Sequence, residues 1–217
     1  MIAVLALPLA LLTLQQGISD RLAGRVSPEI AALVSELGSA AAARGLPIDP
    51  LIQKAIEGSA KGVPSDRVAT AVRLVAAQLD TAAAGLRDGG STGDTVAIAA
   101  GAFAITAGLT GRDIAELARS GSRPSELIVG LRVAGTLTAL GVPRAETVAL
   151  VSATLQGGRP VADLLALPGQ VQAQVARGTT PAQAAAGLAR AAAAQARRGP
   201  PPSRPQPPPH PVPPPQP

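Results

Sequence analysis

The side chains that could do chemistry in this 217-residue chain are few in kind. The sequence has no Cys and no Tyr, and its single histidine, His210, lies among the prolines of the C-terminal end. Nucleophilic and acid–base catalysis need groups with tuned protonation, so only carboxylates, two lysines and hydroxyls remain for that work. Without thiolates or a second histidine, the usual zinc and iron–sulfur sites are excluded as well. We therefore expect no enzyme activity, no metal and no cofactor.

Two pairs of charged side chains have the spacing of neighbours on a helix. Glu57 and Lys61 are four residues apart with the acid first, which is typical of a stabilising surface ion pair. Asp113 and Glu116 are three apart and could converge as paired acids, but Asp113 also completes a capping box with Thr110. We interpret the first pair as a surface ion pair and Asp113 as a helix cap.

A glycine-rich stretch over residues 88–94 could offer backbone N–H groups to an anion or oxygens to calcium. It lacks the Lys-Ser/Thr ending of a phosphate-binding loop and the alternating acids of a calcium loop. We interpret it as a connector that ends in Asp94, the cap of the next helix.

Prolines and glycines mark the ends of the elements that would position these residues. Residues 27–28, 49–50 and 180–181 each pair an N-cap residue with a proline in the first helical turn. Glycines at 45, 62 and 141 are each followed by an apolar residue and a proline, which indicates a helix end with a left-handed glycine. We expect about eight helices, over roughly 28–44, 50–61, 65–86, 94–108, 111–120, 124–140, 144–156 and 181–198, with two short helical pieces over 160–177 broken at Pro168.

Residues 95–111 carry no charge and are the most apolar internal stretch. Ala100, Ala104 and Gly108 form a row of small residues that would let a neighbouring helix approach closely. A membrane span is one interpretation and a strand is a minor one. The stretch is short and rich in alanine, which favours a central buried helix.

A weak internal repeat joins three segments, 60–64, 118–124 and 176–181. Each has a small residue, a base, a glycine and a proline in that order, and the prolines lie 60 and 57 residues apart. One interpretation is a stack of helical hairpins that presents a repeated polar face to a partner. The other is that any short helix joined to a long one needs the same capping residues.

Composition and periodicity together predict the fold class. The chain has 46 alanines, one aromatic residue and apolar positions that recur at helical spacing, as in the row Val68, Val72 and Leu79. Such a core suits close helix packing better than a β-sandwich. We expect an all-α, alanine-rich array of helical hairpins, solenoid-like if the repeat is real, with a disordered polyproline C-terminal tail.

The two ends of the chain differ from its body. Residues 1–16 form an apolar segment that we interpret as a signal peptide, so that the helical domain over 17–199 is extracytoplasmic; the alternative is an N-terminal core helix of a cytoplasmic protein. Residues 200–217 are mostly proline and predict an extended polyproline II tail.

The net charge of +5 is confined to the C-terminal part. Residues 1–163 hold 14 acids and 14 bases, so the body has no basic stripe, and without aromatic platforms we expect no nucleic-acid binding. The excess arginines could contact an acidic partner, or those at the last helix end could merely complement its dipole. The candidate contact residues are Arg190, Arg197, Arg198 and Arg204.

These observations favour a non-enzymatic helical scaffold or protein-interaction module, whose partner is an unidentified protein or an acidic surface polymer. The alternative is a membrane-tethered spacer held by an uncleaved N-terminal segment, which is the one membrane contact we expect.

Overall fold

The computed structural model describes residues 16–121 and 123–198. These residues form ten helices with their connections and no strand. The all-α prediction is confirmed, with more helices than the eight expected. The predicted tail, Arg204 and His210 lie outside the described residues. After a first helix described over residues 16–22, the order is α2 (Pro28–Ala43), α3 (Asp49–Ala60), α4 (Ser65–Asp88), α5 (Thr95–Thr106), α6 (Gly111–Ser120), α7 (Pro124–Ala139), α8 (Arg144–Gln156), α9 (Val161–Val175) and α10 (Pro181–Arg198).

Most of the predicted helix starts are confirmed. The Ser27 hydroxyl accepts a hydrogen bond from the Ile30 amide, and the Asp94 carboxylate accepts one of 2.7 Å from the Ala97 amide. Asp49 is the exception, because α3 already includes it and its carboxylate pairs with Arg21 at 2.6 Å instead of capping the helix. A long-range ion pair has thus replaced the local cap that the sequence predicted.

The predicted glycine stops are confirmed at all three positions. Gly45, Gly62 and Gly141 have φ angles of +71°, +67° and +86°, in the left-handed region that glycine adopts without a steric cost. After the first of these, the Leu46 amide reaches back to the Ala41 carbonyl at 2.9 Å, the long bond of a Schellman motif.

The predicted break at Pro168 is wrong. α9 continues through Pro168 as one helix, although the proline has no N–H to donate to the Leu164 carbonyl. Leu164, Leu167 and Val171 are all buried on one face of α9, on both sides of the proline. Their shared burial against α7 holds the two halves in line and outweighs the local preference for a break.

The helices form three consecutive units of three: α2–α3–α4, α5–α6–α7 and α8–α9–α10. Within each unit the first and third helices run parallel. Their matching ends meet, as where Arg44 pairs with Asp80 in the first unit and Arg159 contacts Gln195 in the last. The third helix of a unit then packs on the first two helices of the next. These contacts therefore group helices α2 to α10 in threes.

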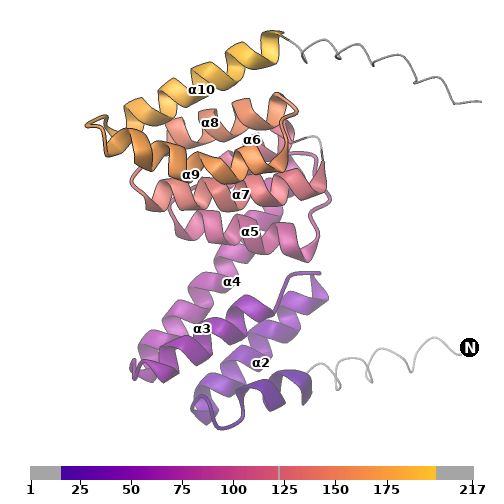
Figure 1. Ribbon diagram of the computed structural model, residues 1–217. Helices are drawn as coiled ribbons and strands as arrows, with labels where there is room; N and C mark the ends of the chain where they lie inside the picture. The colour runs from indigo at the N-terminus through magenta and orange to yellow at the C-terminus, as the bar shows by residue number, and fades with distance from the viewer. Residues whose placement is uncertain (1–15, 122, 199–217) are drawn as a thin grey trace, which may run out of the picture.

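Helix α4 links the two ends of the molecule. Figure 1 shows it running from the bundle formed by α2 and α3 into the stack formed by α5 to α10. Small residues allow the close packing here. A Cβ at Gly85 would lie 2.5 Å from the Gly111 carbonyl oxygen, and one at Gly101 would lie 3.0 Å from the Cβ of Ala82.

Helix α5 lies inside this stack, packed against α4 and α7. Its small residues Ala100 and Ala104 are buried, and a Cβ at Gly135 of α7 would come within 3.1 Å of Ala104. The prediction of a buried helix that neighbours approach closely is confirmed at Ala100 and Ala104, and the strand alternative is wrong. Gly108, the third residue of the predicted row, lies after the end of α5 and is exposed. Among the described helices, none is long and apolar enough to cross a membrane.

Candidate interaction surface

The three copies of the sequence repeat occupy equivalent places in the three units. Residues 60–64 join α3 to α4, residues 118–124 join α6 to α7, and residues 176–181 join α9 to α10. Each copy therefore links the second helix of a unit to the third. The copies thus lie at corresponding connections of the three units, and the 57-residue offset pairs the residues of α7 with those of α10.

One row of α7 is buried by the next unit, and the same row of α10 is not. Gly130 of α7 lies against Leu155 and Val151 of α8, within 3.5 Å of an added Cβ. A Cβ at Gly187, the equivalent glycine of α10, would meet nothing within 4 Å. In α7 the row is Glu126, Gly130, Val133 and Leu137, all buried; in α10 it is Gln183, Gly187, Arg190 and Ala194, none of them buried.

The candidate arginines follow this same face of α10. Arg190 and Arg197 lie seven residues apart, about two helical turns, and Arg198 adjoins them. All three side chains are exposed, and α10 contains no acid. In the described part of the chain none of the three takes part in an ion pair. The structure thus brings three of the four predicted contact residues together.

Charge is distributed unevenly over the units. Residues 16–93 hold eight acids and eight bases, and residues 94–143 hold four of each. Residues 144–198 hold two acids and six bases, a net charge of +4. The basic end of the sequence is therefore the basic end of the array.

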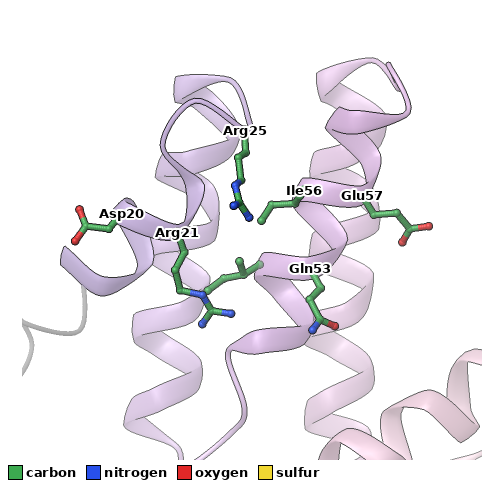
Figure 2. Close-up of a pocket in the computed structure, with 7 residues that line it drawn as sticks. Asp20, Arg21, Arg25, Gln53, Ile56 and Glu57 are labelled. Atoms are coloured by element: carbon green, nitrogen blue, oxygen red, sulfur yellow. The ribbon is translucent and has the colours of Figure 1, made fainter.

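A hollow elsewhere on the described surface is partly occupied by an internal ion pair. The hollow between residues 16–22 and α3 has a volume of about 440 Å³. Figure 2 shows Arg21 and Arg25 directed into it, whereas Asp20 and Glu57 point away. Because Arg21 already binds Asp49, this hollow offers one further cation beside apolar walls and no pair of acids.

The predicted Glu57–Lys61 ion pair is confirmed. Glu57 accepts hydrogen bonds from Lys61 and also from Lys54, whose Nζ lies 2.9 Å away. The hydrogen bond to Lys61, followed by that to Lys54, lowers the pKa of Glu57 from its ordinary value of 4.5 to about 2. A carboxylate held ionised in this way on an exposed helix face is a structural ion-pair partner.

Asp113 has the predicted capping role. Its carboxylate accepts a hydrogen bond of 2.8 Å from the Thr110 amide, and the Thr110 hydroxyl accepts one from the Asp113 amide. Arg144 also lies 3.3 Å from the Asp113 carboxylate. These contacts occupy Asp113, and in the described residues no group of three or more His, Cys, Asp or Glu side chains could hold a metal.

Sequence reasoning missed the neighbours of the glycine-rich loop. Residues 91–93 line a hollow of about 280 Å³ together with Arg44 and Arg87. Arg44 forms an ion pair with Asp80 and donates a hydrogen bond to the Ala40 carbonyl, so its side chain connects the end of α2 to α4. Arg44 follows the end of α2 and Arg87 lies near the end of α4, so no local pattern could have brought the two arginines together.

No family model, curated protein or solved structure matches the chain.

Proposed function

We propose that the protein is a non-enzymatic helical scaffold or interaction module that binds an acidic partner through the exposed face of α10. One observation carries this proposal. The row of α7 that faces the next unit is buried, whereas in the described part of the chain no residue of the matching row of α10 is buried, and that row includes Arg190.

The chemistry of this face suits a macromolecular partner. Arg190, Arg197 and Arg198 supply planar guanidinium groups that bind carboxylates with two parallel hydrogen bonds. Gly187, three residues before Arg190, and the exposed Ala191 after it leave room for a backbone or a helix to approach. Because contacts with exposed charges are screened by salt, binding should weaken as ionic strength rises.

Affinity capture with the full chain tests the proposal. The baits are the natural chain, the triple variant Arg190→Ala, Arg197→Ala and Arg198→Ala, and a control with Arg67→Ala and Arg73→Ala on an exposed face of α4. Partners found by mass spectrometry should be lost with the α10 variant and kept with the control. Partners that all three baits capture equally would contradict the proposal.

The same experiment with a chain shortened at residue 199 separates α10 from the proline-rich segment. Retained partners would assign binding to the helices. Loss of every partner on shortening would assign it to residues 200–217 and away from α10.

Export of the protein is a further part of this proposal, supported by the apolar residues 1–16. We expect a mature N-terminus near Gly17 in the soluble extracytoplasmic fraction. An intact N-terminus in the membrane fraction would instead support the tethered spacer, and an intact chain in the cytoplasm would reject both.

A further inference from the structure

The arginine face of α10 has a counterpart of opposite charge on α2. The helix α2 contains Glu29 and Glu36 and no base, whereas α10 contains three arginines and no acid. Among helices α2 to α10, no other carries two or more charges that are all of one sign. Glu29 and Glu36 are exposed, and neither forms an ion pair with a described residue.

The two faces also match in spacing. Glu29 and Glu36 lie seven residues apart, as do Arg190 and Arg197, so each pair spans about 10.5 Å along its helix. Ala32 lies between the two acids on the exposed row of α2, and Ala194 lies between Arg190 and Arg197 on the row of α10. Both ion pairs could therefore form at once across two closely packed helices. The exposed row of α2 is Glu29, Ala32, Glu36, Ala40 and Ala43.

We propose that α10 of one chain binds α2 of a second copy of the same chain, head to tail. This inference rests on the proposed function and names the acidic partner. The third helix of one unit packs antiparallel to the first helix of the next unit, as the Thr106–Gln78 hydrogen bond between α5 and α4 shows. The same orientation places Glu36 opposite Arg190 and Glu29 opposite Arg197.

The charges decide the geometry of the assembly. Contact of α10 with another α10, or of α2 with another α2, would oppose like charges and is disfavoured. Figure 1 places α10 and α2 at opposite ends of the molecule, so both can be engaged at the same time. Ile18 covers a different side of α2, against Gly38, and leaves the acidic row exposed. A head-to-tail contact that does not close into a ring extends into an open chain of copies.

Sedimentation of the full chain at different salt concentrations tests self-association. Two helices bury little area, so the contact belongs to the weak, transient class. We expect masses above the monomer at about 0.01 M salt, where the Debye length is about 30 Å, and the monomer at about 1 M, where it is about 3 Å. A natural chain that stays monomeric at low salt and high protein concentration overturns the inference.

Charge reversal identifies the surfaces. The variant Glu29→Lys with Glu36→Lys and the variant Arg190→Glu with Arg197→Glu should each associate roughly tenfold or more weakly, because attraction becomes repulsion. Mixing the two variants, or combining all four changes in one chain, should restore association. The control Arg67→Glu with Arg73→Glu changes the net charge by the same amount as the α10 variant, but on α4. This control should associate as the natural chain does.

Neutral variants test whether the charge-reversed variants lose association only because they misfold. Glu29→Gln with Glu36→Gln and Arg190→Gln with Arg197→Gln should keep the helical circular dichroism signal and still associate less than the natural chain. Association that no α2 or α10 variant weakens, or that mixing does not restore, rejects this contact. A monomeric chain that still captures an acidic protein through α10 rejects the second copy alone, whereas loss of both results rejects the proposed function too.

Discussion

Glu57 lies between two lysines on α3, and this placement controls its ionisation. Its pKa is lowered to about 2, first by the hydrogen bond to Lys61 and then by that to Lys54. A lowered folded-state pKa stabilises the fold at pH values above the ordinary 4.5. That contribution is lost as pH falls toward 2. Because the carboxylate is exposed, salt should weaken the effect.

A titration of the Glu57 carboxyl carbon by NMR checks this pKa. We expect a midpoint near 2 in the natural chain. Lys61→Ala should raise it further toward 4.5 than Lys54→Ala does. A natural midpoint at 4.5, unchanged by either substitution, would show that the two lysines do not hold the carboxylate in solution.

Gly85 and Gly169 are helical glycines in opposite surroundings. A Cβ at Gly85 would lie 2.5 Å from a backbone oxygen of α6, whereas one at Gly169 would meet nothing within 4 Å. Gly85→Ala should therefore lower the free energy of unfolding by about 1–3 kcal/mol through overpacking. Gly169→Ala should raise it by up to about 1 kcal/mol through helix propensity.

Urea unfolding of the two alanine variants measures both effects against the natural chain. The opposite signs make the pair informative, since the substitution is the same in each. If both variants were stabilised by the same amount, α4 and α6 would not be as close as the structure places them.

At the scale of elements, Pro168 shows where packing overrides local preference. Proline inside a helix costs about 3 kcal/mol relative to alanine, and α9 bears this cost because its buried leucines hold it in place. Pro168→Ala should restore the bond to the Leu164 carbonyl and raise the free energy of unfolding by up to about 3 kcal/mol. Thermal and urea unfolding would measure this change in the free energy of unfolding. A variant less stable than the natural chain would mean that the proline ring itself is needed for packing.

The boundaries of most elements could be predicted from sequence because they are set locally. Thr110 and Asp113 cap each other across three residues, and Gly62 ends α3 by its own backbone conformation. What depended on distant contacts could not be predicted. Asp49 pairs with the distant Arg21 instead of capping α3, and residues 16–22 contain no proline that would mark their helix in the sequence.

The sequence predicted the residues of the candidate site but not the surface that they form. Sequence alone pointed to Arg190, Arg197 and Arg198 through the uneven charge. It could not show that α10 repeats a helix-accepting face of α7, because that requires the contact between Gly130 and α8. The same limit applies to α2, whose two acids become a matching row only once their exposure is known.

At the scale of the whole molecule, the array has neutral first and middle units and a basic last one. Repeat arrays usually end in a polar face that prevents further stacking. In the proposed assembly, the basic face of α10 at one end complements the acidic face of α2 at the other end. The face of α10 that ends one chain can therefore bind α2 of the next chain. Salt and protein concentration would then control the length of the assembly.

Amide hydrogen exchange of the full chain at low salt, compared between dilute and concentrated protein, tests this account most directly. We predict that concentration slows exchange in α10 and α2, and that about 1 M salt abolishes the difference. Slower exchange confined to other helices would contradict an interaction surface on α10. Exchange in α10 that changes neither with protein concentration nor with any added partner would contradict it as well.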